Sequence, residues 1–394
     1  MNRESGLDLS DFPKELTLLL ALLQEGDETN ISERIKDKLT DIDWNRFLEL
    51  VRHHRVYPLM YLKLRKVVDQ ELIPVKIMQA LHSDYTRNTF QMLHLSGEME
   101  KICRAFNENG IFSLMLKGPV LAETLYGDIS LRTSKDLDIL VNVDDVEKAE
   151  QMLSAHGYES KSNFPRILGD WKWKIHHVSY FHPQKGILVE LHWRLYSELG
   201  SEPHFKELWE RKNRSFLTTE PVYFLGEEDL FLYLTSHGAR HGWFRLRWLV
   251  DVDRMVRRGL KWENVRILLK KHRSLHIGGQ ALLLASQLLN TPLTQQMNSM
   301  AYVRRPVKLA QQSIVFIKEK LDSYPPPKHF AGRFKRYSFS LLPLTQKYIF
   351  LISRLHPSSY DAELLPLPKA LHFIYFPLRP FLWFWRQMKH RTQA

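Results

Sequence analysis

The sequence predicts an α+β fold, in which a small mixed β-sheet core with flanking helices stands between helical N-terminal and C-terminal regions. Apolar residues recur at three- and four-residue spacing before residue 108 and after residue 226, a period typical of amphipathic helices. Short runs of strand-forming residues, bounded by turn signals, lie between these two regions. With 394 residues, 44% of them hydrophobic, the chain can bury a large core, which excludes disordered and fibrous classes.

Helices are predicted throughout the first hundred residues. Trp44, Phe47 and Val51 follow helical spacing after Asp43, which we expect to cap the helix at its N-terminus. Pro58 is expected to break or kink this run. A second amphipathic segment extends from about residue 75 to residue 106, and its apolar face predicts a packing role.

The pattern changes at the Asn109-Gly110 turn, which precedes a strand predicted over residues 111–116. Pro119 suits the first turn of a short helix, and Gly127 is expected to end that helix. This part of the sequence therefore predicts a strand, a tight connection and a helix of one or two turns.

A second strand is predicted over residues 135–141, where acidic and apolar residues alternate. Asp144 is expected to cap the following helix, with Glu147 in the capping-box position, and Gly157 to end it. Residues 178–182 and 187–193 then predict two strands joined as an antiparallel hairpin.

The same signals divide the chain into four parts. Residues 1–108 form a helical N-terminal region, and residues 109–225 an α/β core. Residues 226–322 are predicted to be a helical region that completes the active site. Residues 323–394 form a basic, aromatic-rich tail after the connector that Pro325-Pro326-Pro327 marks.

Three carboxylates are the best candidates for chemistry. Asp136 and Asp138 project from one face of the predicted strand, with their Cα atoms roughly 6.5 Å apart. Glu190 is an isolated acid in a later apolar strand. Carboxylates from two adjacent strands are what two-cation phosphoryl transfer requires. The alternative interpretation of the aspartates is a solvated strand edge or a salt-bridged pair.

Residues around these acids could hold phosphate. Gly118 allows close approach of the backbone to a phosphate, and Lys117 and Arg132 can neutralise its charge. Ser134 could donate a hydrogen bond to a phosphate oxygen or could equally cap a turn.

Several stretches carry a recognisable pattern beyond the acidic pair. They are Leu116–Leu121, Leu125–Asp128, Leu131–Val141, Val189–Trp193 and His237–Asp251. Together they resemble the uncharacterised nucleotidyltransferase family of bacteria, within the polymerase-β-like superfamily. The resemblance extends over about Trp44 to Asp253 and weakens in the C-terminal third.

The resemblance implies a mixed sheet with flanking helices and an enzyme that transfers a nucleoside monophosphate from an NTP to an acceptor, releasing pyrophosphate. It implies two Mg²⁺ ions. Mn²⁺ is the possible substitute, and we expect ATP as the favoured NTP, although the sequence leaves the base preference open. Asp136 and Asp138 would be metal ligands, and Glu190 the third carboxylate. One departure is that Lys117-Gly118 stands eighteen residues before Asp136, where the superfamily usually has Gly-Ser shortly before its acids.

Histidines supply further candidates. His192 is predicted to share a strand face with Glu190, which favours it over the other histidines of the hairpin. His237 and His241 are four residues apart on one helix face, so they could pack beneath the site, contact nucleotide or bind metal. Packing is the favoured interpretation of this pair.

Two basic segments remain open to more than one interpretation. Arg245 could contact phosphate or pair with Asp251 or Asp253 along the helix. The alternation in Trp171-Lys172-Trp173-Lys174 is typical of a half-exposed strand, but could also provide stacking for a base.

Charge and composition bound the partners and the compartment. The net charge of +12 attracts polyanions, and the aromatic, basic tail could pack on the core, contact a membrane surface weakly or bind a partner. We expect a cytoplasmic protein without a signal peptide or transmembrane helix, and nucleic acid is the least favoured partner. The alternative functions are a catalytically inactive nucleotide- or partner-binding protein and a basic nucleic-acid-binding protein. The acceptor could be a sugar, a peptide, a small molecule or a protein hydroxyl.

Overall fold

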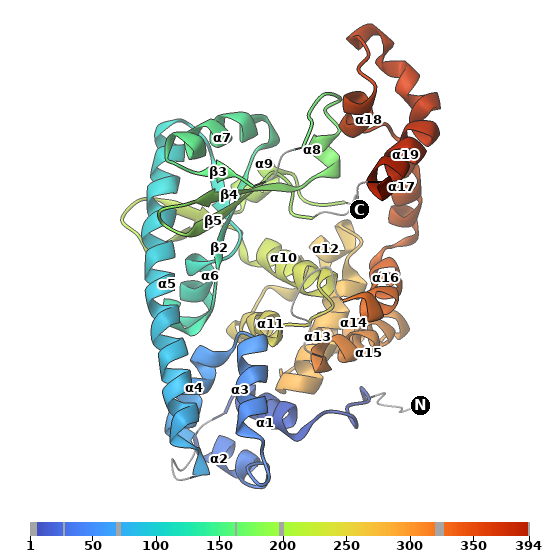
Figure 1. The fold of residues 1–394 in the computed structure, drawn as a ribbon. Coiled ribbons are helices and arrows are strands. Elements are labelled where there is room, and N and C mark those ends of the chain that lie inside the picture. The colour runs from blue at the N-terminus through green and yellow to red at the C-terminus, as the bar shows by residue number, and fades with distance from the viewer. Residues whose placement is uncertain are drawn as a thin grey trace.

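A computed structural model describes residues 6–26, 28–67, 72–161, 164–196, 201–319 and 327–392. A twisted sheet lies between a long helix on one side and a bundle of helices on the other. The C-terminal helices run along one edge of the molecule, from the bundle back to the sheet-containing part (Figure 1). This arrangement agrees with the predicted α+β class.

The sheet is mixed and has seven strands in the order β3-β4-β5-β2-β1-β7-β6. Their bounds are β1 Ser113–Met115, β2 Asp136–Val141, β3 Glu159–Ser160, β4 His177–His182, β5 Ile187–His192, β6 Asn213–Ser215 and β7 Val222–Phe224. The central strands β2 and β5 are parallel, whereas β1 is antiparallel to β2 and β4 is antiparallel to β5. The β4–β5 pair confirms the predicted hairpin.

One face of the sheet is packed against helices because β2 alternates in polarity. Leu137, Ile139 and Val141 join a core with apolar residues of α5 (Val75–Glu108) and α7 (Val146–Ala155). The acidic residues of β2 consequently point to the opposite face, toward the helical bundle.

The connection between β1 and β2 follows the predicted local signals. Helix α6 (Pro119–Tyr126) begins with Pro119 in its first turn. Gly127 ends α6 in the left-handed conformation, with a φ of 71°. A short 3-10 helix, η2 (Ile129–Leu131), then leads into the segment before β2.

The N-terminal helices also follow the sequence. They are α1 Lys14–Leu23, α2 Glu28–Lys36, α3 Trp44–His53 and α4 Tyr57–Val67. Asp43 caps α3 as predicted, because its side chain accepts hydrogen bonds from the backbone N–H groups of Asn45 and Arg46. The helical run is interrupted between His53, the last residue of α3, and Tyr57, the first residue of α4, next to Pro58 as predicted.

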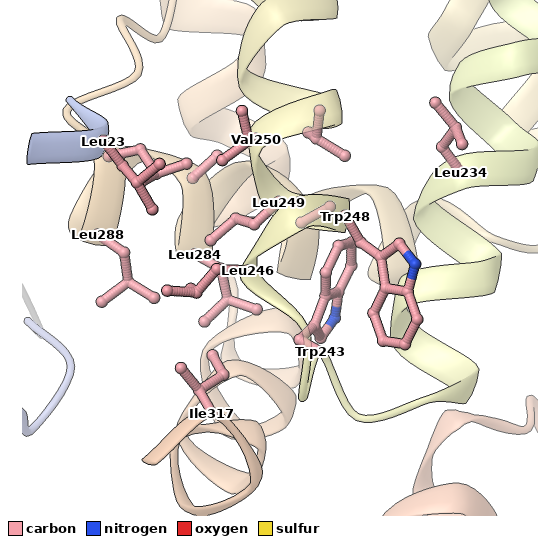
Figure 2. Close-up of a cluster of buried hydrophobic side chains, with 14 of the residues drawn as sticks. Leu23, Leu234, Trp243, Leu246, Trp248, Leu249, Val250, Leu284, Leu288 and Ile317 are labelled. Atoms are coloured by element: carbon pink, nitrogen blue, oxygen red, sulfur yellow. The ribbon is translucent and has the colours of Figure 1, made fainter. Parts of the chain in front are cut away.

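The remaining helices build the bundle and the C-terminal segment. Their bounds are α8 Trp171–Lys174, α9 Phe205–Glu210, α10 Glu227–Arg240, α11 Leu246–Arg258, α12 Trp262–Lys271, α13 Leu275–Leu289, α14 Gln295–Ala301, α15 Arg304–Lys318, α16 Lys328–Leu341, α17 Leu344–Leu355, α18 Ser359–Leu364 and α19 Tyr375–Thr392. The N-terminal helices and the bundle share one core. Figure 2 shows part of it, with Leu23 of α1 near Leu284 and Leu288 of α13.

Two local predictions are wrong. Asp144 does not cap α7, because the short 3-10 helix η3 (Val143–Asp145) precedes it and the side chain of Asn142 accepts from the N–H of Asp144. Trp171–Lys174 is the helical turn α8 instead of a strand, and the Trp171 ring packs against that of Trp193. The first departure is a local cap formed by Asn142 in place of Asp144, and the second accompanies the packing of α8 on β5.

The tail packs on the core only in part. Pro325 and Pro326 lie outside the described residues, and Pro327 directly precedes α16. Phe334 and Tyr337 of α16 are buried in the helical core, whereas no side chain of α17 is buried. None of the helices in the described ranges is long and apolar enough to cross a membrane.

Candidate metal and nucleotide site

Two of the predicted acids meet at the centre of the sheet. Asp138 of β2 is the direct register partner of Glu190 on the neighbouring parallel strand β5. Their side chains therefore share the face that points toward the helical bundle. Asp138 is completely buried, whereas 24% of the Glu190 side chain is exposed.

The imidazole of His192 lies between these two carboxylates. Its Nε2 is 3.3 Å from Oδ1 of Asp138 and 3.4 Å from Oε2 of Glu190. Burial alone lowers the pKa of His192, but the two carboxylates outweigh it and raise that pKa above its usual value. The protonated ring in turn lowers the pKa of Glu190 to about 2, despite the opposing effect of burial.

This trio fits a divalent cation. Asp138, Glu190 and His192 each offer a ligand atom, and these atoms lie within 4.8 Å of one another. Among the described residues, Oδ2 of Asp138 and Nδ1 of His192 are buried without a hydrogen-bond partner, whereas Oδ1 of Asp138 faces the cations of Lys117 and His192. Buried polar atoms are rarely left unsatisfied, and carboxylate oxygens with an imidazole nitrogen are ligands for divalent cations such as Mn²⁺.

Strand β4 and the residue directly before it bring two more histidines to the same place. His177 stacks on His192 with ring centroids 4.9 Å apart, and its Nε2 is 3.9 Å from Oε1 of Glu190. His176 adjoins His177, with 2.9 Å between Nε2 and Nδ1, and forms a second possible ligand group with His177 and His192. Burial lowers the pKa of His177 to about 4, so this ring is neutral and available as a ligand at neutral pH. Sequence reasoning had singled out only His192 of this hairpin.

Asp136 lies apart from that trio. It occupies the same face of β2 two residues earlier, and it is partly exposed at the start of the strand. The hydroxyl of Ser134 donates to the backbone oxygen of Asp136 and lies 3.4 Å from Oδ1 of its side chain. The structure thus places the two aspartates in different surroundings, with Asp138 buried at the centre and Asp136 at the rim.

Lys117 contacts the site from the end of β1. Its Nζ lies 3.0 Å from Oδ1 of Asp138, and only 11% of its side chain is exposed. Burial opposes the charge, but Asp138 outweighs it and raises the pKa of Lys117 above its usual value. Next to it, Gly118 is the N-cap of α6 with φ 88° and ψ −146°, a conformation that is essentially restricted to glycine. Gly118 therefore positions the N-terminus of α6 beside the acidic strand.

Arg132 is held away from the acids. Its Nε and Nη2 each donate to one oxygen of Asp251 at 2.9 Å, and 1% of the side chain is exposed. The hydroxyl of Tyr126 donates to the same carboxylate at 2.8 Å. The structure therefore supports a structural ion pair for Arg132, where the sequence had predicted a phosphate ligand.

The helical histidines pack beneath the site. His237 lies 4.7 Å from His241 between ring centroids, and both rings contact Trp248. Burial is the main reason that the pKa values of both histidines fall well below their usual value. Neither belongs to a possible metal-ligand group within the described ranges, which favours the packing interpretation.

Arg245 lines a basic cavity beside Asp136. The cavity has a volume of about 870 Å³ and is also lined by Arg55, Ser134 and Lys135. Arg245 donates to the backbone oxygen of His53, while Asp251 is paired with Arg132 as described above.

The charge in this cavity is predominantly positive. Asp84 is one of its acidic residues, and it is paired with both Arg52 and Arg87. The guanidinium of Arg55 is the main cause that lowers the pKa of Lys135, with burial as the second cause. Cations that crowd one another in this way favour a bound anion. Arg55 and Lys135 were missed from the sequence because the segment between α3 and α4 and the segment before β2 come together only in the fold.

Comparisons with known proteins identify the family to which the chain belongs. The family described as uncharacterised nucleotidyltransferase matches residues 40–290. No curated protein matches the sequence. A solved structure that matches is that of an antigenic nucleotidyltransferase-like protein from Paracoccidioides brasiliensis, which is 15% identical. The match covers 50% of this chain and 97% of that chain, with a TM-score of 0.30.

Proposed function

Because the chain belongs to the uncharacterised nucleotidyltransferase family, we propose that it transfers a nucleoside monophosphate from an NTP to an acceptor hydroxyl. Pyrophosphate is the second product, and ATP is the favoured donor. The observation that carries this proposal is the convergence of Asp138, Glu190 and His192 with unsatisfied buried ligand atoms. We place the activity in the cytoplasm, where ATP is abundant.

A divalent cation, Mg²⁺ or Mn²⁺, would be held by Asp138, Glu190 and His192, and would displace the proton of His192, because only the neutral imidazole is a ligand. The cation would supply Lewis-acid stabilisation of charge on the α-phosphate. The pKa of about 2 for Glu190 favours a permanent anionic ligand over a proton acceptor. Asp136, which is partly exposed at the rim, is the carboxylate left to orient the acceptor hydroxyl and receive its proton.

Basic groups on either side of the acids would hold the phosphates. Lys117 is buried and protonated beside Asp138, so it can neutralise charge that develops on the leaving pyrophosphate. Arg55, Lys135 and Arg245 line the cavity beyond Asp136 and offer further anion contacts. The acceptor oxygen forms a bond to the α-phosphorus, and the bond from that phosphorus to pyrophosphate breaks.

Calorimetric titration of the four NTPs with Mg²⁺ or Mn²⁺ tests the site. The Asp138→Asn variant keeps the shape of the side chain but removes its charge, so metal-dependent binding should weaken by at least about a hundredfold. Asp144→Asn is the matched control, because Asp144 is an exposed aspartate shortly after the end of β2, with 80% of its side chain accessible.

The results separate the candidate functions. Equal NTP binding by the wild type and Asp138→Asn would overturn the site assignment. Metal-dependent NTP binding that never yields labelled acceptor in a cell extract supplied with α-labelled ATP would support the inactive binding protein. Salt-sensitive nucleic-acid affinity without NTP binding would support the nucleic-acid-binding alternative.

A further inference from the structure

Helix α17 connects two segments, α16 and α18, that are each anchored to the rest of the molecule. On one side, Tyr337 of α16 donates from its hydroxyl to the backbone oxygen of Ala239 in α10. On the other side, Ser359 of α18 donates to Asp170, next to α8. Between these anchors α17 has no buried side chain, and it runs along the edge of the molecule in Figure 1.

The residues of α17 are apolar despite this exposure. The exposed fractions are 57% for Leu351, 66% for Ile352 and 65% for Leu355. Tyr348 is 66% exposed on the same helix. A row of exposed aliphatic residues on one helix is typical of an interaction surface, because a monomer gains nothing from leaving it in water.

Helix α19 extends this surface with aromatic residues. It contacts α17 and leaves Phe376, Phe381, Trp383 and Phe384 exposed. Trp is enriched where proteins meet the headgroup layer of a membrane, and Phe is typical of the apolar face of helices that lie in that layer. Because none of the described helices can cross a membrane, this surface suits a position in the plane of the interface.

The same segment carries most of the excess positive charge of the chain. Residues 327–392 contain eleven lysines and arginines and only two acidic residues. Their formal charge is therefore +9, compared with +12 for the whole chain. One of the two acids, Asp361, is buried and paired with Arg379 and Arg386. The apolar surface therefore lies in a strongly basic segment with a single further carboxylate, that of Glu363.

We propose that α17 and α19 form a docking surface for an anionic lipid bilayer. Each basic residue near such a surface contributes about 1 kcal/mol of attraction, and the exposed aliphatic and aromatic side chains bury apolar area in the interface. A second copy of the chain would bring two segments of like charge together, which opposes self-association. Nucleic acid would match the charge but would leave the aliphatic side chains in water.

Docking would bring the bilayer next to a second cavity. This cavity, of about 820 Å³, is lined by Phe350 and Arg354 of α17 and by Arg240 of α10. This cavity therefore lies between α17 and the end of α10, and bilayer binding itself does not depend on the proposed function.

Vesicle co-sedimentation of the full chain tests the proposal. We expect binding to phosphatidylcholine vesicles that contain about one third phosphatidylglycerol, and at least about tenfold weaker binding to phosphatidylcholine alone. Raising the salt concentration should weaken binding to the anionic vesicles. Equal binding to both kinds of vesicle, or no binding to either, would overturn the proposal.

Two sets of variants test the surface itself. Leu351→Ser, Ile352→Ser and Leu355→Ser together should reduce binding by at least about tenfold, because three exposed apolar side chains are lost. The matched control changes Val75, Phe90 and Leu93 of α5 to Ser, which are 71%, 68% and 54% exposed. The control should bind as the wild type does; equal losses in both sets would overturn the assignment to α17.

A second variant, the tail variant, removes charge by combining Lys347→Gln, Arg354→Gln and Lys369→Gln. Its control combines Gln substitutions at the exposed residues Lys76, Lys261 and Arg266. The tail variant should lose at least about tenfold more affinity for anionic vesicles than the control. Concentration-dependent dimers, or nucleic-acid complexes, that are lost in the α17 Ser variant without any vesicle binding would replace the bilayer with that other partner.

Discussion

Arg132 shows how burial limits what a charged residue can do. Both oxygens of Asp251 accept hydrogen bonds from its guanidinium, and the hydroxyl of Tyr126 completes the site. Two ions that have left water are stabilised mainly by each other, so removing one leaves the other uncompensated. A phosphate could recruit Arg132 only by breaking this pair.

We therefore expect Arg132→Met to lower the free energy of unfolding by about 3–5 kcal/mol. Urea denaturation followed by circular dichroism measures this change. Lys135→Met, a change at a neighbouring exposed cation, should alter stability by less than about 0.5 kcal/mol. Unchanged stability of Arg132→Met together with weaker NTP binding would instead return Arg132 to the phosphate site.

The backbone conformation at Gly118, and not a lack of room for a side chain, restricts this position to glycine. A Cβ atom at this position would meet its nearest neighbour, Cδ2 of Leu137, at an ordinary 3.7 Å. Its φ of 88° with ψ of −146° is nevertheless a region in which other residues are strained.

Gly118→Ala should therefore cost about 1–3 kcal/mol of stability, or else shift the N-terminus of α6. Gly97→Ala is the control, because Gly97 is an exposed residue within helix α5 with open space around it. There Ala should stabilise the protein by up to about 1 kcal/mol. Thermal unfolding of both variants measures the difference, and equal effects at the two positions would contradict the strain argument.

At the scale of elements, helix α13 holds the end of α16 through a histidine. Nε2 of His276 lies 2.7 Å from the backbone oxygen of Leu341, which requires the ring to donate. Burial lowers the pKa of His276 to about 4, against the opposing effect of this hydrogen bond.

This shift predicts acid sensitivity. Below the ordinary pKa of about 6.5 the unfolded chain binds a proton that the folded chain excludes, so stability is lost as the pH falls from 6.5 toward 4. His276→Gln keeps a donor without titrating and should flatten this part of the pH profile. Unfolding free energies at several pH values measure it, with exposed His329→Gln as the control, and parallel profiles for wild type and His276→Gln would contradict it.

The elements differ in how far their own residues determine them. Helix α5 and the β4–β5 hairpin follow from apolar periodicity and turn residues, because those signals act within one segment. The start of α7 and the turn α8 were not predicted: Asn142 caps the short helix η3 in place of a cap by Asp144, and Trp171 of α8 packs against Trp193. Strand alternation groups Asp136 with Asp138 on one strand and Glu190 with His192 on another. The pairing of these two strands, and the approach of His177 and Arg55, depend on how separate elements pack.

At the scale of the molecule, ligand binding should stabilise the fold. A ligand that binds only the folded chain at a concentration of about 100 Kd adds about 2.7 kcal/mol. We expect Mn²⁺ with ATP to raise the melting temperature of the wild type and of Asp144→Asn, but not that of Asp138→Asn. Differential scanning fluorimetry measures this, and an equal rise in Asp138→Asn would place the ligand elsewhere.

The sequence by itself determined the α+β class, most element positions and the acids on one strand face, because periodicity and strand alternation are local properties. Only the tertiary structure decided which charges face one another. It paired Arg132 with Asp251, placed His192 between two carboxylates and joined the N-terminal helices to α10–α15 in one core. Those contacts join residues far apart in the chain, where electrostatic energy depends on distance and burial that no local pattern encodes.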